Sequence, residues 1–338
     1  MSVITILGAR GFGTALAVAC HREGNTVYLW SPFESQLCDI CADNENKKLL
    51  PGVAVSPEIH LTTELDCCGE SDLVIIATAS FAVGETAERI KPYLGKNTVV
   101  ASVAKGFNPS DNRRLSEVIE EKLPQHPVVV VSGPSHAEEI ARNVPTTVVA
   151  ASKNREAAEY VQGLLSSATL RLYVNDDVVG VELGGALKNV ISICAGICVG
   201  LGLGDNTRAA LMTRGITEIA RLGVAMGAQT ETFAGLTGIG DLIVTCTSEH
   251  SRNRRAGVMI GQGVSPKEAV QKVGTVEGYT AAKIAYELSQ AYHIEMPIVH
   301  ETYEVLYHDK PIDQALAALM ERPTRHESEE IWLKEKNN

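Results

Sequence analysis

The stretch Val3-Ile4-Thr5-Ile6-Leu7-Gly8-Ala9-Arg10-Gly11-Phe12-Gly13-Thr14-Ala15-Leu16-Ala17 decides the fold. Its first five residues predict a buried strand, and the residues from about Thr14 have a helical pattern. A glycine-rich loop joins the two. In this order of strand, loop and helix, backbone N–H groups at the helix start can bind a pyrophosphate. The stretch therefore predicts a dinucleotide site made of Gly8, Arg10, Gly11, Phe12 and Gly13.

This loop departs from the usual fingerprint, G-x-G-x-x-G. Gly8 and Gly13 take the first and third glycine positions, but Arg10 takes the second. The next predicted strand, at 26–30, is followed by Ser31-Pro32-Phe33, which lacks the acid that would bind the adenosine ribose of NAD. Either NAD or NADP is therefore permitted, and we hypothesise that Arg10 reaches the 2′-phosphate of NADP. A tight turn without a ligand is the alternative.

The first half of the chain repeats this alternation of strand and helix. Further apolar runs lie at 72–80, 98–104, 127–133 and 146–152, with helical patterns such as 87–90 and 115–119 between them. The rhythm ends near residue 177. It predicts a parallel sheet with helices on its faces, that is, an α/β domain with a Rossmann-type doubly wound sheet.

The second half has almost only helical patterns, at 181–200, 209–226, 266–273, 279–291 and 311–320. A length of 338 residues suits two domains. We therefore expect a dinucleotide-binding domain at 1–178 and an all-α substrate and catalytic domain at 179–338. The apolar stretch 181–203 approaches the length of a membrane span, but it contains Lys188, Asn189 and several glycines. We interpret it as a buried core helix, without stable membrane insertion.

Composition excludes several classes of protein. A net charge of −11 without a basic run argues against a nucleic-acid partner. The first residues lack a charged and then apolar leader, so we expect a cytoplasmic protein whose eight cysteines are reduced. Cys38 and Cys41 form a C-x-x-C pair, but no second pair has similar spacing, and no metal is expected.

Four further segments carry a resemblance to a known family. They are AKGF at 104–107, SGPSHAEEIARNVPT at 132–146, GGALKNV at 184–190, and GLTGIGDLIVTC followed by SRNRRAG from 235 to 257. In this order and spacing the chain resembles the bacterial NAD(P)-dependent glycerol-3-phosphate dehydrogenases over its whole length. The resemblance implies NAD(P)H-dependent, reversible reduction of dihydroxyacetone phosphate to sn-glycerol 3-phosphate, which supplies glycerophospholipid synthesis. It also implies a homodimer.

Lys188 is the candidate catalytic residue. It lies in an apolar helical pattern, and Gly184 and Gly185 one turn before it would let a ligand approach. Burial disfavours the ammonium form and lowers the pKa of a lysine toward the range useful for proton transfer. The resemblance implies that Lys188 gives its proton to the developing alkoxide. A lysine that extends to water from a core helix is the alternative.

The other substrate candidates in the second half are Asp241 and the run Ser251-Arg252-Asn253. Asp241 follows a glycine-rich turn, where a helix N-cap is an equally good interpretation. The resemblance places it at the substrate. Ser251, Arg252 and Asn253 offer a hydroxyl, a guanidinium and an amide, which suit phosphate oxygens. A solvated basic turn is the alternative.

In the first half, Lys105 and the segment 133–135 follow predicted strands directly, at the carboxyl edge where such sheets bind ligands. A solvated strand-end lysine is the alternative. The resemblance implies that Lys105 binds substrate and cofactor and that Gly133 and Ser135 bind substrate. The further cofactor residues that it implies are Ala137, Arg252, Val276 and Glu277. The segment Thr78-Ala79-Ser80-Phe81 departs from the family pattern.

Two rival functions remain open at this point. A β-hydroxyacid dehydrogenase would share the two-domain architecture and a lysine on the first long helix, with a carboxylate substrate instead of a phosphate. A non-catalytic dinucleotide sensor would use the glycine-rich loop alone. Lys188, Asp241 and the run at 251–253 argue against the sensor, because a sensor needs no proton-transfer site.

Overall fold

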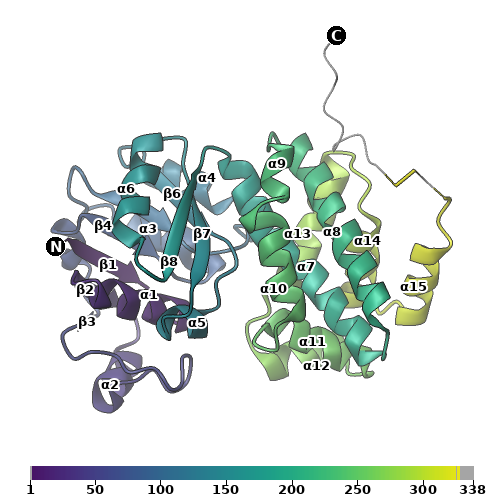
Figure 1. The fold of residues 1–338 in the computed structure, drawn as a ribbon, viewed down its shortest axis with the longest axis horizontal. Helices are drawn as coiled ribbons and strands as arrows, with labels where there is room; N and C mark the ends of the chain where they lie inside the picture. Colours follow the sequence, from purple (N-terminus) through teal and green to yellow (C-terminus); the bar gives the residue numbers. More distant parts are fainter. Residues whose placement is uncertain (1, 325, 328–338) are drawn as a thin grey trace, which may run out of the picture. The chain divides into compact units, whose positions relative to one another are not determined.

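The computed structural model describes residues 2–324 and 326–327, and the chain divides into two compact units between Val178 and Val179. Residues 1, 325 and 328–338 of the two expected domains lie outside the described residues. The first unit contains an eight-stranded sheet in the order β3-β2-β1-β4-β5-β6-β7-β8 (Figure 1). The strands are β1 Val3–Leu7, β2 Thr26–Trp30, β3 His60–Thr62, β4 Leu73–Ile76, β5 Val99–Ser102, β6 Val128–Ser132, β7 Thr146–Ala151 and β8 Leu170–Asn175.

Helices cover both faces of this sheet because successive strand residues point to opposite sides. Ile4 and Ile6 of β1 belong to one buried cluster, together with residues of α1 and α6, whereas Leu7 belongs to a second cluster with residues of α3 and α4. The helices of this unit are α1 Gly11–Arg22, α2 Glu34–Asp43, α3 Val83–Ile90, α4 Leu115–Lys122, α5 Ala137–Ala141 and α6 Arg155–Leu165, with short 3₁₀ turns at Asp66–Gly69 and Ser80–Ala82. The predicted doubly wound α/β fold is confirmed.

The predicted parallel sheet contains one antiparallel pair of strands. β7 runs antiparallel to β6, and β8 is parallel to β7. A short apolar run looks the same in a parallel and in an antiparallel strand, so the sequence could not show this reversal. Two strands were also not predicted. β3 has three residues, and β8 alternates buried and exposed side chains at its start, so neither forms a continuous apolar run.

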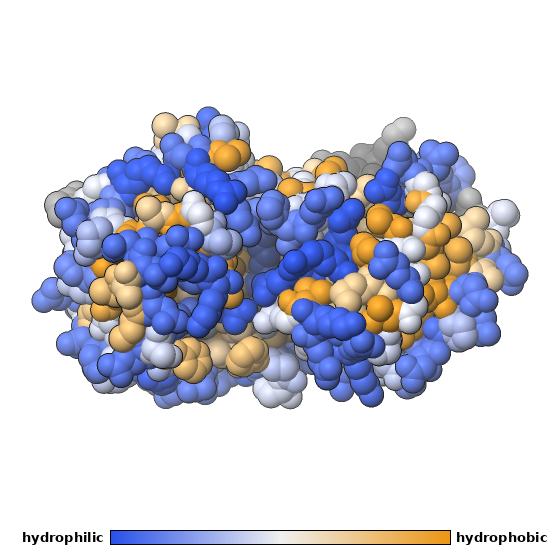
Figure 2. Space-filling model, turned by 90° about the horizontal axis from the view of Figure 1, so that it is seen from below, coloured by the Kyte–Doolittle hydropathy of each residue, from blue (hydrophilic) through white to orange (hydrophobic). Residues whose placement is uncertain are grey.

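The second unit is built from helices. They are α7 Val178–Gly200, α8 Asp205–Ala225, α9 Thr230–Phe233, a π-helical turn Leu236–Gly240, α10 Asp241–Thr247, α11 Arg252–Gly261, α12 Pro266–Val273, α13 Glu277–Ala291, α14 Pro297–Tyr307 and α15 Ile312–Met320. Five of these were predicted with small errors at their ends. α9, α10, α11 and α14 were not predicted. On the face seen in Figure 2, hydrophobic residues gather over part of this unit.

α7 is the central helix of the second unit. It is long and apolar enough to cross a membrane by length and composition, but 83 % of its most apolar window is buried inside the protein, as expected for a core helix. Glycines let α11 approach it closely. A Cβ at Gly257 would lie 2.1 Å from the Ile193 carbonyl oxygen, and one at Gly196 would lie 2.1 Å from that of Arg254. The backbones of α7 and α11 therefore touch, which holds the two helices in a fixed register.

Candidate functional site

The glycine-rich loop has the geometry of a phosphate-binding turn. Gly8 directly follows β1 and has φ +125°, and a Cβ there would lie 2.8 Å from the carbonyl of Ala77. A Cβ at Gly13 would lie 2.0 Å from the carbonyl oxygen of Gly8. Gly11, which the usual fingerprint lacks, faces the Leu49 carbonyl, 2.5 Å from where its Cβ would be. All three positions therefore require glycine for close backbone approach.

Helix α1 begins directly at this loop. Arg10 is its N-cap residue, half-buried and extended, and its side chain makes no capping hydrogen bond. The first intrahelical bond runs from Thr14 N to the Arg10 carbonyl at 2.8 Å, so the N–H groups of Gly11, Phe12 and Gly13 have no partner within the helix. Together with the dipole of a twelve-residue helix, these groups suit a pyrophosphate. The loop fits the dinucleotide that the sequence predicts.

Two polar side chains that the sequence analysis did not single out anchor the loop. Gln36 Nε2 and Asn46 Nδ2 both donate to the carbonyl oxygen of Ala9, at 2.6 and 3.0 Å. Asn46 Nδ2 also lies 2.9 Å from Thr14 Oγ1 at the start of α1. Both residues lie more than 25 positions beyond Ala9 and belong to no motif, so nothing local could have identified them.

Lys105, Gly133 and Ser135 meet where β5 and β6 end. Lys105 Nζ donates to the Gly133 carbonyl oxygen at 2.8 Å, and Ser135 Oγ donates to the same oxygen at 2.9 Å. Gly133 has φ +137°, and a Cβ there would lie 3.1 Å from Val148 Cα. The structure therefore brings these three candidates together at the carboxyl edge of the sheet. Ala137 begins α5.

In the second unit, Lys188 of α7 meets α10. Its Nζ donates to Asp241 Oδ1 and, at 2.7 Å, to Thr245 Oγ1. The Thr245 hydroxyl in turn donates to the Asp241 carbonyl oxygen at 2.7 Å, the bond that one helical turn allows. Lys188 is 5 % exposed and Asp241 is 1 % exposed. A buried ammonium is thus held by one carboxylate and one hydroxyl.

This pairing excludes two of the alternatives given above. Lys188 does not extend to water, since its ammonium is bound inside the unit. Asp241 is not a helix N-cap, because Gly240 takes that position and the Asp241 carboxylate faces Lys188. A carboxylate this close favours the ammonium form of a lysine, and the sequence did not show this partner. Asp241 lies 53 positions from Lys188, so the sequence could not show the pair.

Gly184 does not give a ligand access to Lys188. A Cβ there would lie 2.4 Å from the Thr237 carbonyl oxygen, so the π-helical turn before α10 fills this side of α7. The glycine instead lets that turn come close enough to place Asp241. The interior near Lys188 is apolar enough that burial raises the pKa of the neighbouring Cys246 thiol to about 12. Charged groups in such surroundings interact strongly.

The run at 251–253 forms the start of α11. Ser251 is the N-cap, and its Oγ accepts from Arg254 N at 3.2 Å. It is not a solvated turn, because Ser251 and Asn253 are buried and Arg252 is half-buried. Ser251 Oγ also lies 3.1 Å from Ser192 Oγ, whose hydroxyl donates to the Thr245 carbonyl at 2.9 Å. Hydroxyl groups thereby connect α7, α10 and the beginning of α11.

Asn253 connects α11 with α7 and α13. Its Nδ2 donates to Asn189 Oδ1 at 2.9 Å, and its Oδ1 accepts from Gly278 N at 2.8 Å. Asn189 Nδ2 lies 3.3 Å from Glu277 Oε2, at the first residue of α13, for which Val276 is the N-cap. The middle of α7, which carries Lys188, therefore lies beside the starts of α10, α11 and α13, which carry Asp241, Ser251, Asn253 and Glu277. Sequence analysis missed Thr245, Asn189 and Ser192, which hold these residues in place.

Among the described residues, no group of three or more His, Cys, Asp or Glu side chains has an arrangement that could hold a metal ion. The eight cysteines are all free thiols.

Comparison with known proteins gives matches over nearly the whole chain. Models of the NAD-dependent glycerol-3-phosphate dehydrogenase N-terminus and C-terminus match residues 3–158 and 177–317. Proteins named glycerol-3-phosphate dehydrogenase [NAD(P)+] from Desulfitobacterium hafniense and Moorella thermoacetica are 48 % and 51 % identical, over 98 % and 96 % of this chain and 95 % and 98 % of theirs. A crystal structure of glycerol-3-phosphate dehydrogenase from Coxiella burnetii superposes with a TM-score of 0.90 at 40 % identity, covering 95 % of this chain and 99 % of that one.

Proposed function

Because the chain belongs to the NAD-dependent glycerol-3-phosphate dehydrogenase family, we propose that Lys188 is the residue that moves the proton in its reaction. The enzyme uses NAD(P)H to reduce dihydroxyacetone phosphate reversibly to sn-glycerol 3-phosphate, which supplies glycerophospholipid synthesis. Family membership rules out the two rival functions, a β-hydroxyacid dehydrogenase and a dinucleotide sensor. When bound, the nicotinamide cofactor supplies or accepts the hydride.

The observation that carries this proposal is the buried group of Lys188, Asp241 and Thr245. Reduction adds a hydride to the carbonyl carbon and a proton to its oxygen, so a general acid must lie within hydrogen-bond distance of that oxygen. Lys188 Nζ is an ammonium with three N–H donors, and it bonds to Asp241 and Thr245. In the substrate complex, one of these donors faces the carbonyl oxygen. Nζ loses its proton to the developing alkoxide, and the same amine takes the proton back from the alcohol in the oxidation direction.

Asp241 and Thr245 hold the ammonium for this transfer. Asp241 favours the charged, proton-bearing form, and the Thr245 hydroxyl oxygen fixes the direction of Nζ. Because both partners are already in place in the folded protein, little reorganisation is needed as charge develops on the substrate oxygen. Asp241 is also proposed to contact the substrate.

The substrate phosphate is proposed to bind Arg252, with Ser251, Asn253, Lys105, Gly133 and Ser135 as further substrate ligands. Arg252 carries the main charge, because Ser251 and Asn253 already make structural hydrogen bonds. Arg254 supports a basic site here, since its buried Nε makes no hydrogen bond within the described residues. Binding energy from the phosphate would position the carbonyl for reaction.

The cofactor is NAD or NADP. We propose that the backbone of Gly8, Gly11, Phe12 and Gly13 holds its pyrophosphate, and that Arg10 reaches a 2′-phosphate. The other proposed cofactor residues are Lys105, Ala137, Arg252, Val276 and Glu277. We also propose that the enzyme acts as a homodimer in the cytoplasm.

A comparison of two neighbouring arginines tests the phosphate site. Arg252→Ala should lower kcat/KM for dihydroxyacetone phosphate by about 10²-fold or more, since a charge-assisted bond to a phosphate contributes roughly 1.5–3 kcal/mol and its geometry also positions the carbonyl. Arg255→Ala is the matched control, because Arg255 is exposed on the same helix turn. The reaction rates of both variants are measured at 340 nm, as oxidation of NADPH and of NADH.

The same two variants should be assayed with dihydroxyacetone, which lacks the phosphate. Arg252→Ala is expected to leave this slow reaction nearly unchanged, so that the loss is confined to the phosphorylated substrate. Equal losses for Arg252→Ala and Arg255→Ala with dihydroxyacetone phosphate would contradict a phosphate site at the start of α11.

A further inference from the structure

Two amide side chains from a later part of the chain hold the carbonyl oxygen of Ala9 in the glycine-rich loop. Gln36 Nε2 donates to this oxygen at 2.6 Å, and Asn46 Nδ2 donates to it at 3.0 Å. Gln36 lies in the first turn of α2, and Asn46 lies just after the end of that helix. A carbonyl oxygen has two lone pairs, so these two donors satisfy it and fix its direction.

Both amides are themselves held in one orientation. Ser31 Oγ, directly after β2, donates to Gln36 Oε1 at 2.8 Å. Asn46 Nδ2 also donates to Thr14 Oγ1 at 2.9 Å. Because the Ala9 oxygen can only accept, the nitrogen of each amide has to face it. Ala9, Thr14, Ser31 and Asn46 are all buried, so water does not compete for these bonds.

Fixing the Ala9 oxygen also fixes the direction of the Arg10 N–H group. The two groups belong to one planar trans peptide unit, in which the C=O and N–H bonds point in opposite directions. The oxygen points to the buried side of the loop, toward Asn46, with Thr14 Oγ1 3.4 Å away. The N–H group of Arg10 therefore points to the other side of the loop.

This orientation decides whether the loop attracts or repels an anion. A backbone N–H carries a partial positive charge, and a carbonyl oxygen carries a partial negative charge. Rotation of the Ala9–Arg10 peptide would exchange the two groups and turn the oxygen toward a bound phosphate. Glycine, which has the greatest backbone freedom, comes directly before and directly after these two residues. Gln36 and Asn46 restrain the peptide against this rotation.

The segment after α2 meets the loop at a second point. The Asn46 carbonyl oxygen accepts from Leu50 N at 2.8 Å, which forms a turn. In this turn the Leu49 carbonyl oxygen lies 2.5 Å from where a Cβ at Gly11 would be. Side-chain bonds and close backbone packing from one segment therefore support the loop from Ala9 to Gly11.

We propose that Gln36 is a positioning residue for the cofactor, with Asn46 as its buried partner. Gln36 holds the Ala9–Arg10 peptide so that its N–H, and not its oxygen, faces the pyrophosphate. This inference rests on the proposed binding of the pyrophosphate by the loop. Because Gln36 acts through the loop backbone, it governs the affinity for the cofactor and not the chemical step.

Gln36→Glu tests this role. The new side chain keeps the shape and still accepts from Ser31, but a carboxylate oxygen replaces the N–H group that faces Ala9. The probe is ADP-ribose, which has the pyrophosphate but no nicotinamide, and calorimetry measures its Kd. We expect this Kd to rise about tenfold at about pH 8, because two oxygens then face each other.

The pH dependence of this Kd separates positioning from a general loss of structure. Protonation of the new carboxyl group restores a donor to the Ala9 oxygen. The Kd of Gln36→Glu should therefore return toward that of the unmodified chain as the pH is lowered to about 5. The charge of ADP-ribose is constant over this range. Gln36→Met, which cannot donate, should raise the Kd about threefold at every pH.

Ser35→Glu is the matched control for the added charge, because Ser35 is the exposed neighbour of Gln36 on α2. Its Kd for ADP-ribose should equal that of the unmodified chain. In all three variants, kcat at saturating NADPH should change less than about twofold, because the chemical step is not affected.

An unchanged Kd in Gln36→Glu would overturn the proposal. So would a rise that does not depend on pH, or an equal rise in Ser35→Glu. Arg10→Glu shows whether the site itself has failed, because a negative charge in the loop should weaken binding of a pyrophosphate there. If Arg10→Glu weakens ADP-ribose binding and Gln36→Glu does not, the loop is the cofactor site but Gln36 does not position it. If neither does, the pyrophosphate binds elsewhere.

Discussion

At the residue scale, the Thr245 hydroxyl accepts from the Lys188 ammonium and donates to the backbone of α10. Thr245→Val keeps the shape and removes both bonds. We expect the free energy of unfolding to fall by about 1–3 kcal/mol, because a buried donor loses its acceptor. Turnover should fall at least tenfold, or about 1.4 kcal/mol, because the ammonium is no longer directed. Urea unfolding and the 340 nm assay measure the two effects.

The control for this substitution is Thr247→Val on the same helix. Thr247 makes the equivalent bond to the carbonyl one turn before it, at 2.8 Å, but it is exposed and does not contact Lys188. Stability should change by no more than about 0.5 kcal/mol, with normal turnover. Equal losses in both variants would mean that the backbone bond, and not the contact with Lys188, explains the effect at Thr245.

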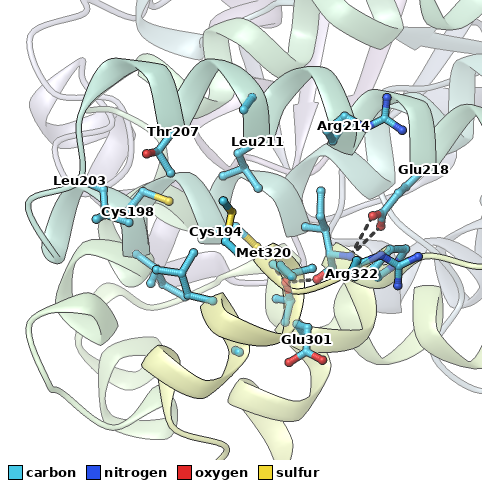
Figure 3. Close-up of a pocket in the computed structure, with 18 of the residues that line it drawn as sticks. Cys194, Cys198, Leu203, Thr207, Leu211, Arg214, Glu218, Glu301, Met320 and Arg322 are labelled. Carbon is cyan, nitrogen blue, oxygen red and sulfur yellow. Dashed lines mark hydrogen bonds between the residues drawn. The ribbon is translucent and has the colours of Figure 1, made fainter. Parts of the chain in front are cut away.

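The surroundings of Glu218 (Figure 3) lead us to predict a pH dependence of stability. Burial raises the pKa of its carboxyl to about 7, although two backbone N–H groups partly offset this. The folded state therefore holds the proton more tightly than the unfolded state, whose group titrates near 4.5. The stability that this proton contributes is complete below about pH 4.5 and is lost as the pH rises through about 7.

Glu218→Gln removes the titration but keeps an oxygen that accepts from α14. The free energy of unfolding of the variant, relative to the unmodified chain, should increase by about 3 kcal/mol between pH 4.5 and pH 8, at 1.36 kcal/mol for each unit of pKa shift. Denaturant unfolding at several pH values gives the difference. A difference that does not depend on pH would show that Glu218 has an ordinary pKa in the folded protein.

At the scale of elements, the contact of α7 with α11 depends on glycine. Gly257→Ala would place a methyl group 2.1 Å from the Ile193 carbonyl oxygen, so the helices must separate. We expect a loss of about 3 kcal/mol or more, as in other overpacked cores, with turnover reduced because α11 carries the proposed phosphate ligands. Thermal unfolding measures the change.

Gly163→Ala is the opposite case and serves as its control. Gly163 lies inside α6 with no atom within 4 Å of a Cβ built there. Alanine should therefore raise stability by about 0.5–1 kcal/mol through lower backbone entropy in the unfolded chain. If Gly257→Ala also left stability unchanged or raised it, close backbone packing would not explain the glycines of α7 and α11.

Elements with a strong apolar pattern could be predicted from the sequence, and those defined by their neighbours could not. The strands β1, β2, β4, β5, β6 and β7 are runs of apolar residues, and α7 is recognisable by its length. The reversal at β7 and the short edge strand β3 depend on pairing partners. α11 was not predicted as a helix, because its three arginines and Asn253 interrupt the apolar pattern that the buried Ala256 and Ile260 would give.

The residues of the candidate site also divide into those that the sequence could identify and those that it could not. Gly8 and Gly13 could be identified because the backbone conformation at a phosphate-binding turn requires glycine, and Lys188 because a charge inside an apolar helix is unusual. The partners of Lys188 could not, since Asp241 and Thr245 become neighbours only when α10 packs on α7. The anchoring role of Gln36 and Asn46 likewise exists only in the folded loop.

At the scale of the whole molecule, the two units have separate tasks in this proposal. The first unit supplies the backbone cradle at the start of α1, and the second supplies the buried ammonium of Lys188. A change at Lys188 should therefore remove turnover without removing cofactor binding. Simple removal of the lysine is a poor test, because it leaves the Asp241 charge buried without a partner and destabilises the unit by about 3–5 kcal/mol.

Lys188→Arg avoids that difficulty and tests the central claim most directly. The guanidinium keeps a positive charge beside Asp241 but cannot give up a proton at neutral pH. The measurement is kcat for reduction of dihydroxyacetone phosphate at 340 nm, together with NADPH binding by titration. The account predicts that kcat falls by about 10²–10⁴-fold, the usual contribution of general acid catalysis, while the Kd for NADPH changes less than about twofold. A kcat within tenfold of the unmodified enzyme would contradict proton transfer by Lys188.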